Sequence, residues 1–394
     1  MTTTLEPRRS PEDVPPAPAS PRRPNSRIAV MDGLRLVAAL SVSLFHLAGD
    51  LPSGQAWETD PRNLFPHLFS YASFGWLGVE LFFMISGFVI CMSCWGRTPG
   101  QFFRSRVVRL FPAYWPAVLI TTAVVTLWPV ASHRLPTDEI ILNLSMMNKA
   151  FGVKSVDSAY WTLWCELRFY VLFGVVMLWR GLTLHRTLLF CYGWLIAGAV
   201  AAAGKLPVLE LVFQSQYAPL FVAGIAFFLI HKFGSNLQIW GAIALSWMMA
   251  MHNVDRRVIA AAKVGRVDLD PKVGMLVMTL FFVVLGIIAL GWTARIQWRW
   301  LTYAGALTYP YYLLHQSIGW SLIHGLNGRL DPWLVLSLTI GILLVSAWLL
   351  HRLVEKPVAK LLKRTLDQAS AAMRDSARQE RERTSAASDP ASAP

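Results

Sequence analysis

Arg35 and His46 are the first residues of this chain whose types and spacing could do chemistry. They lie eleven positions apart within one apolar stretch, residues 28–48. Each residue of an α-helix turns by about 100°, so eleven steps bring the two side chains to within roughly 20° of one direction, roughly 16 Å apart along the axis. A histidine in such a place can act as a general base, and the arginine can hold an anionic group. A structural histidine that hydrogen bonds to a neighbouring helix is the alternative.

Four arginines follow the second apolar stretch, in the segment 96–112, which contains no acidic residue. Aromatic and aliphatic residues are interspersed among them at helical spacing, which predicts an amphipathic helix at the membrane surface, between the second and third spans. Arg106 and Arg109 are three positions apart and share one face of that helix, where they could bind a phosphorylated ligand. Attraction to anionic lipid headgroups explains the same charges equally well.

Two carboxylates interrupt apolar segments. Glu80 lies at the start of the second stretch, and Glu166 lies near the start of the fourth. A buried carboxylate needs a partner, and Arg35, Arg168 and His46 are the candidates that the sequence offers. Structural pairing between helices is the alternative to a role in binding or catalysis.

His315 is a further polar residue within an apolar stretch. It ends the sequence YPYYLLH at residues 309–315, where Pro310 predicts a break or kink in the helix. We expect His315 to contribute to substrate binding, although a structural histidine is again the alternative.

Membrane-spanning helices must position these residues, because 55% of the 394 residues are hydrophobic and only 15% are charged. A helix of about 20 apolar residues crosses a bilayer. Ten stretches approach that length: 28–48, 74–94, 119–131 with its upstream flank, 161–179, 187–203, 217–230, 240–251, 273–290, 301–323 and 333–350. The sequence therefore predicts an all-α polytopic membrane protein, a bundle of about ten transmembrane helices, of which the 240–251 helix is short.

Polar segments flank this domain, which we place at residues 28–357. Residues 1–27 and the basic residues 358–394 have the composition of disordered tails, and no cleavable signal peptide fits the N-terminal segment. With ten spans, most basic residues lie on the same side as both tails, so the positive-inside rule predicts that both termini are cytoplasmic. The basic segment 252–272 does not fit, because it falls on the outer side.

The net charge of +13 requires no nucleic-acid partner, since anionic lipids suffice to explain it. The four cysteines all lie in or beside apolar segments, at positions 91, 94, 165 and 191. We expect small buried residues there rather than ligands of a metal, and predict no metal site.

Five blocks of sequence, in order, resemble the acyltransferase-3 membrane family. They are MDGLRLVAAL at 31–40 with His46, GVELFFMISGF at 78–88, RVVRLFP at 106–112, WTLWCELRFY at 161–170 and YPYYLLH at 309–315, and the resemblance extends to VEKP at 354–357. Such proteins O-acylate cell-surface glycans or secreted natural products from the bacterial cytoplasmic membrane, through a bundle of about ten helices. In this chain Glu80 stands where Asp is more usual, and Thr162 and Cys165 replace smaller residues.

The resemblance implies roles for particular residues. Arg35, His46 and Glu166 would be catalytic, and Arg106 and Arg109 would bind acyl-CoA, with acetyl-CoA as the expected co-substrate. The expected acceptor is a hydroxyl group of a glycan, a lipid-linked sugar or a natural product. A transporter or flippase for a glycan or small molecule is the rival class, because it also buries ionisable groups in many spans, but the chain has no internal repeat. A membrane scaffold would leave the polar pair in the first stretch unexplained.

Overall fold

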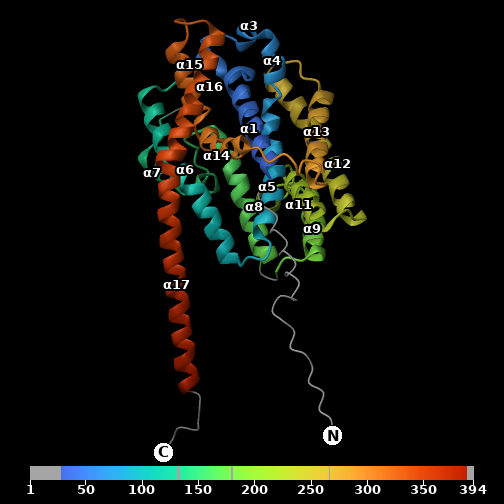
Figure 1. Cartoon of the computed structure of the whole chain (residues 1–394). Coiled ribbons are helices and arrows are strands. Elements are labelled where there is room, and N and C mark those ends of the chain that lie inside the picture. The colour runs from blue at the N-terminus through green and yellow to red at the C-terminus, as the bar shows by residue number, and fades with distance from the viewer. Residues whose placement is uncertain (1–27, 131–133, 179–180, 266, 388–394) are drawn as a thin grey trace, which may run out of the picture.

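The computed structural model describes residues 28–130, 134–178, 181–265 and 267–387 (Figure 1). These residues form helices and connecting turns and contain no strand. The all-α class predicted from the sequence is therefore confirmed. The segment 1–27, which we expected to be disordered, lies outside the described residues.

The helices have the following bounds. The α-helices are α1 (Ala29–Leu44), α2 (Gly54–Trp57), α3 (Pro61–Leu64), α4 (Pro66–Ala72), α5 (Gly78–Cys94), α6 (Pro99–Leu127), α7 (Thr137–Leu144), α8 (Trp161–Leu178), α9 (Leu184–Ala203), α10 (Pro207–Phe213), α11 (Ala218–Phe233), α12 (Leu237–Gly265), α13 (Pro271–Ala289), α14 (Arg299–Leu314), α15 (Ser317–Leu326), α16 (Pro332–Leu349) and α17 (Lys356–Ala387). Two π-helical turns are η2 (Phe45–Gly49) and η7 (Leu350–Glu355), and short 3₁₀ turns are η3 (Leu51–Ser53), η4 (Gly75–Leu77), η5 (Asn148–Phe151) and η6 (Ser158–Tyr160).

Among the described residues, seven helical segments are long and apolar enough to cross a membrane. They are Ala29–Gly49, Pro66–Cys94, Pro99–Leu127, Leu184–Ala203, Pro207–Phe233, Pro271–Ala289 and Pro332–Ala377. The chain is thus a polytopic membrane protein, but the count of ten is not confirmed. The other three expected spans correspond to α8, to α12, and to α14 followed by α15.

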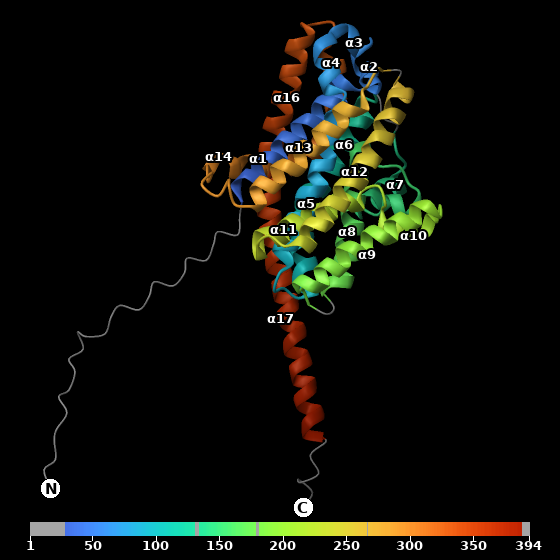
Figure 2. The same cartoon turned by 90° about the vertical axis from the view of Figure 1, so that its right-hand side faces the viewer.

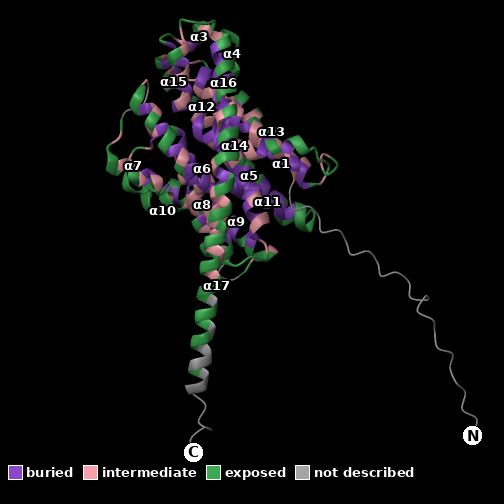
Figure 3. Cartoon of the chain, turned by 60° about the vertical axis from the view of Figure 1, so that its left-hand side comes forward, coloured by how far each residue is buried: buried purple, intermediate pink, exposed green. Residues whose placement is uncertain are grey.

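Helix α5 lies at the centre of the bundle, and its closest neighbour is α11 (Figures 1 and 2). The two backbones meet at two glycines. A Cβ atom on Gly87 would lie 2.1 Å from the carbonyl oxygen of Phe221, and one on Gly224 would lie 1.9 Å from that of Met84. No side chain fits in either place, so small residues set the separation of the helices, as is common in membrane bundles. Buried residues are concentrated around this contact, whereas α17 is mostly exposed (Figure 3).

Helix α6 differs from the sequence prediction of a separate surface helix before the third span. It is one continuous helix of 29 residues that contains both the basic segment and the apolar one. Pro112 and Pro116 lie inside it. Proline removes a backbone donor, but neighbouring groups can compensate for that loss in a membrane bundle. A capping box of Thr98 and Gln101 begins the helix.

Helix α12 is also longer than predicted. It has 29 residues and continues to Gly265, so most of the basic segment assigned to an outer loop is helical. One of its cations is inside the protein: the Arg257 guanidinium lies 4.4 Å from the Trp76 ring centroid and forms an ion pair with Glu80. A cation with these partners can remain within an apolar bundle, which the pattern of the sequence alone did not indicate.

The C-terminal segment is a helix where we expected a largely disordered tail. Helix α17 has 32 residues, continues from α16 through η7, and projects from one end of the bundle (Figures 1 and 2). Its sequence is rich in Lys, Arg, Ala, Leu and Gln, which are good helix formers. Arg104 of α6 also anchors it, through an ion pair of 2.9 Å with Asp367 and a hydrogen bond of 3.2 Å to Ser370.

The glycine contact between α5 and α11 yields a prediction about stability. Gly224→Ala forces the two backbones apart, and overpacking of this kind costs about 1–3 kcal/mol. We expect a lower midpoint of thermal unfolding for the purified protein in detergent. Gly193→Ala in α9 is the matched control, because a Cβ there meets no atom within 4 Å. Equal midpoints for the two variants would contradict the importance of the contact.

Candidate active site

A cavity of about 120 Å³ lies between α1, α5, α6, α8 and α14. It brings together four of the site residues expected from the sequence. These are Arg35, Arg106, Arg109 and Glu166. Three cations therefore share one small space with one carboxylate, and the four residues come from three different helices, α1, α6 and α8.

Hydrogen bonds and ring contacts hold the charged groups of the cavity. The Ser86 hydroxyl lies 2.5 Å from Oε1 of Glu166, to which it donates. The Arg106 guanidinium lies 5.9 Å from the Tyr170 ring centroid and donates to the Ser93 hydroxyl at 3.4 Å. These contacts reduce the cost of keeping the charges away from water.

Arg35 and Arg109 also line a wider cleft of about 520 Å³, which adjoins the cavity. The cleft is lined by residues from the start of α1 and the start of α14, and by His351 and Lys356. Its cations exceed its single carboxylate, Asp32, which lies 3.5 Å from Arg35. The cleft can therefore take an anionic group, with the narrower cavity behind it.

Glu355 holds Arg109 at this boundary. Its Oε1 atom lies 3.3 Å from Nη1 of Arg109, and its Oε2 atom lies 2.7 Å from Nδ1 of His351. Both His351 and Glu355 belong to the π-helical turn η7. Such turns are rare in proteins, but those that occur are often found at functional sites, because they change the direction in which side chains point.

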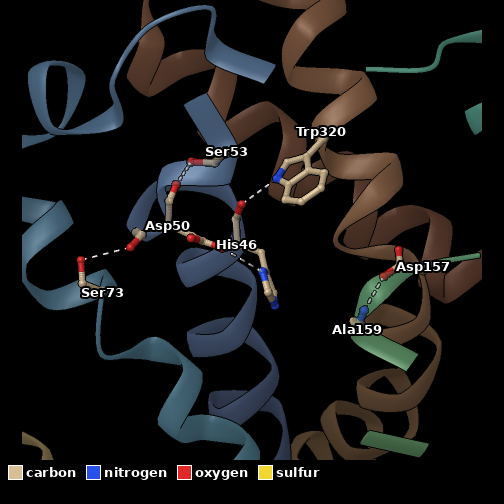
Figure 4. A network of polar contacts seen from close by, with 8 residues as sticks. His46, Asp50, Ser53, Ser73, Asp157, Ala159 and Trp320 are labelled. Atoms are coloured by element: carbon tan, nitrogen blue, oxygen red, sulfur yellow. Dashed lines mark hydrogen bonds and ion pairs between the residues drawn. The ribbon is translucent and has the colours of Figure 1, made fainter. Parts of the chain in front are cut away.

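His46 does not line the cavity and lies beyond its far wall. Helix α1 ends at Leu44, and His46 is in the π-helical turn η2, so it does not keep the simple helical phase with Arg35 that we expected. Its Nδ1 atom lies 3.8 Å from Oδ2 of Asp50 and has no hydrogen-bond partner among the described residues. The imidazole points away from the helix, towards the side on which Asp157 lies (Figure 4).

Three side chains stabilise the unusual backbone of η2. Trp320 donates to the carbonyl oxygen of His46 at 2.7 Å, and the Ser73 hydroxyl donates to that of Gly49 at 3.1 Å (Figure 4). Trp57 donates to the carbonyl oxygen of Leu47 at 2.8 Å. A π-helical turn changes the regular hydrogen bonds of the helix, and these donors satisfy its carbonyl groups. They thereby fix the direction of His46.

His315 connects His46 with the cavity. The two imidazole centroids are 5.5 Å apart, and the His315 ring lies 5.1 Å from that of Tyr312, which lines the cavity. Nδ1 of His315 lies 2.6 Å from the carbonyl oxygen of Tyr312. Because a carbonyl only accepts, Nδ1 carries the proton and Nε2 presents a lone pair, for which the described residues provide no partner.

The break in the helix occurs at His315 and Gln316, between α14 and α15, and not at Pro310, which lies inside α14. The Tyr160 hydroxyl donates to the carbonyl oxygen of Leu313 at 2.9 Å, where α14 ends. The break allows a histidine from the end of a helix to face the end of α1.

Asp157 is a functional candidate that sequence reasoning missed. It is buried and lies on the side of α1 towards which the His46 imidazole points (Figure 4). Its carboxylate accepts hydrogen bonds of 2.9 Å from the backbone N–H groups of Ala159 and Ser317. The residue lies in a connecting segment, and its only signal in the sequence is that of an acidic cap before a short helical turn.

Glu80 does not line the cavity, and the structure gives it a different partner from those we considered. It pairs with Arg257 of α12 and not with Arg35, Arg168 or His46. Its side chain is only 2% exposed. We expected Glu80 to bind substrate or, alternatively, to pair structurally with another helix, and this position favours the structural alternative.

The four cysteines are buried and form no disulfide. The described residues contain no group of three or more His, Cys, Asp or Glu side chains that could hold a metal ion.

A comparison with family models identifies the family of this chain. A family model described as "Acyltransferase domain" matches residues 28–352. Acyltransferase MdmB of Streptomyces mycarofaciens is 24% identical over 387 residues, which cover 88% of this chain and 95% of that protein. Protein 2 in the picA locus of Rhizobium radiobacter is 30% identical over 124 residues, which cover 30% of this chain and 56% of that protein. No solved structure matches significantly.

The hydrogen bond from Trp320 to the π-helical turn leads to a second prediction. Trp320→Phe keeps the ring but removes the donor, and such a bond contributes about 1 kcal/mol. We expect hydrogen–deuterium exchange in residues 45–50 to become about five-fold faster. Trp298→Phe is the control, since Trp298 is exposed. Unchanged exchange in Trp320→Phe would show that the bond does not hold the turn.

Proposed function

Since the chain belongs to the acyltransferase-3 family of membrane proteins, we propose that it moves an acyl group from acyl-CoA to a hydroxyl group of an acceptor. That it is an integral membrane acyltransferase follows from the family and from the apolar helices. The observation that best supports the finer proposal is the cavity. It joins a cationic cleft at one end to a pair of histidines beyond the other.

The wide cleft suits the charged part of the donor. Acyl-CoA carries several phosphates on its nucleotide, which Arg35, Arg109 and Lys356 can neutralise. The cavity behind it is much smaller, about 120 Å³ against about 520 Å³, which suits a thin chain rather than a nucleotide. In this arrangement the acyl thioester extends towards Tyr312 and the histidines. Acetyl is the acyl group that we propose first.

The transfer itself requires a base. In the proposed step, the acceptor hydroxyl gives its proton to His46 while its oxygen bonds to the thioester carbon. The carbon–sulfur bond then breaks, and the departing thiolate takes the proton from His46. The products are the acyl ester and free coenzyme A. Nδ1 of His46 faces the Asp50 carboxylate at 3.8 Å, so the other ring nitrogen, Nε2, is the candidate for accepting the proton.

Arg35 and Glu166 take supporting roles in this mechanism. Arg35 lines both the cleft and the cavity, so it meets the anionic donor and not the reacting carbon, which lies near the other end of α1. Glu166, held by Ser86, balances the three cations of the cavity and keeps their spacing when no donor is bound.

The donor also suggests an orientation. Acyl-CoA is made in the cytosol, and the cleft is lined by Ile28 and by Lys356, where α1 begins and α17 departs. We propose that this end faces the cytoplasm across a bacterial inner membrane, with both termini on that side. The acceptor, a glycan, a lipid-linked sugar or a secreted natural product, would then approach His46 from the other end of α1.

His46→Ala tests the proposed base. We expect transfer of label from radioactive acetyl-CoA into membrane and secreted products to fall at least about 100-fold, because general-base catalysis contributes about 10²–10⁴-fold. His67→Ala, which changes an exposed histidine, should retain activity. Near-normal transfer by folded His46→Ala protein at equal abundance would exclude the role.

Arg106→Gln and Arg109→Gln test the donor site. Each removes a cation from the cavity wall, so we expect the KM for acetyl-CoA to rise about ten-fold, with a smaller change in kcat. Arg97→Gln removes an exposed cation near the start of α6 that does not line the cavity, and it should leave the KM unchanged. The same KM in all three variants would argue against donor binding in the cavity.

A further inference from the structure

A separate groove lies between α9 and α12, on the outside of the bundle. We call it the α9–α12 groove, and its volume is about 770 Å³. The two helices lie side by side at the edge of the structure (Figures 1 and 2). The groove shares no lining residue with the cavity or with the cleft. The proposed binding of acyl-CoA and transfer of the acyl group do not involve this groove.

The walls of the groove are apolar and exposed. Ala202 and Ala203 line it from α9, and Met248 lines it from α12. Small residues on one side and flexible thioethers on the other leave room for a hydrocarbon chain. Because α9 is one of the candidate membrane spans, these walls face the lipid.

One end of the groove is polar. His252 and Arg256 lie four positions apart on α12, so they occupy one face, and both are exposed. Arg256 has no ion pair within the described part of the chain, whereas the adjacent Arg257 is paired with Glu80. The neighbouring Asp255 does not line the groove. An unpaired cation at the end of an apolar groove favours an anion there.

The position of this end fits a lipid headgroup. Helix α9, a candidate membrane span, ends at Ala203, one of the lining residues, so the polar end lies near the end of that span. Asn253 donates a hydrogen bond of 3.1 Å to the carbonyl oxygen of Gln216, which closes the floor. The floor is therefore fixed by contacts within the protein.

We propose that the α9–α12 groove binds an anionic lipid, with the hydrocarbon chain along the alanine and methionine walls and the phosphate at Arg256 and His252. Basic pockets between transmembrane helices bind acidic headgroups in this way. The occupant that we propose is a bulk anionic phospholipid of the membrane. A phosphorylated lipid that carries the sugar to be acylated is a second source, which the experiment distinguishes.

The second source has a structural basis, which rests on the proposed function. The Arg257 guanidinium lies 5.5 Å from the Tyr217 ring centroid, and the Tyr217 and Phe83 centroids are 5.1 Å apart. Phe83 lines the cavity and Arg257 lines the groove. One layer of aromatic rings therefore separates the groove from the cavity.

Lipid binding can be measured without any activity. The purified full-length protein, delipidated in detergent, is titrated with phosphatidylglycerol and with phosphatidylcholine, and the bound lipids are counted by native mass spectrometry. We expect the wild type to bind phosphatidylglycerol about five-fold more tightly, the effect of one cation near an anionic headgroup. Arg256→Gln should lose this preference, and Arg256→Lys should restore most of it.

Lys263→Gln is the matched control, because Lys263 is an exposed cation on the same helix that does not line the groove. It should keep the preference. The proposal is overturned if Arg256→Gln binds phosphatidylglycerol as the wild type does, or if Lys263→Gln loses the preference equally. Since the measurement involves no acyl transfer, its failure leaves the proposed function untouched.

A polyprenyl phosphate distinguishes the two sources. If the groove serves a lipid-linked acceptor, this probe displaces phosphatidylglycerol at lower concentration, and Arg256→Gln weakens its binding. If the groove takes bulk phospholipid, phosphatidylglycerol remains bound. Displacement of phosphatidylglycerol by the polyprenyl phosphate overturns the assignment to bulk phospholipid, and binding of both probes that is insensitive to Arg256→Gln overturns the site.

Discussion

The cost of placing ionised side chains in an apolar bundle governs this structure. A charge that is removed from water needs a partner of opposite charge or a set of hydrogen bonds within the protein. The main pairs are Arg35 with Asp32, Glu80 with Arg257, Glu166 with Ser86, and Arg109 with Glu355. Three of these four join different helices or helical turns, so satisfying the charges also fixes how the helices pack. The cavity exists because its three cations and its carboxylate have such partners.

Two π-helical turns, η2 and η7, position His46 and His351. In η2, His46 precedes Asp50 by four positions, and in η7 His351 precedes Glu355 by four. Each turn is less regular than an α-helix, and its stability must come from outside the helix. Side chains from other elements supply it at η2, where tryptophans bond to the carbonyl groups of two successive residues. The rigidity of these turns thus depends on tertiary contacts.

The cationic cleft and the candidate catalytic histidines lie towards opposite ends of α1, with the cavity between them. The cations of the cleft lie at the end where α1 begins. Towards the other end lie His46 and His315, each with one imidazole nitrogen for which the described residues provide no hydrogen-bond partner. Tyr312 stands between them, in contact with both the cavity and His315. An acyl donor with a charged head and a thin, reactive tail matches this order, as does an acceptor that arrives from the opposite side.

The sequence by itself determined the class of protein and where apolar helices occur, but not the full lengths of α6, α12 and α17, because the hydrophobic effect acts on local apolar stretches whatever their neighbours. The sequence also placed Arg106 and Arg109 on one face of a helix, because residues three positions apart lie on the same face whatever the helix packs against. Only the tertiary structure decided which charges meet. Glu80 and Arg257 are far apart in the chain. The sequence shows only an arginine next to an apolar stretch, which predicts a loop residue, because the carboxylate that pairs with it is not nearby in the chain. For the same reason, only the packing of the helices identified the long α12 and the candidate residue Asp157. Asp157 accepts a hydrogen bond from Ser317, which is distant in the sequence.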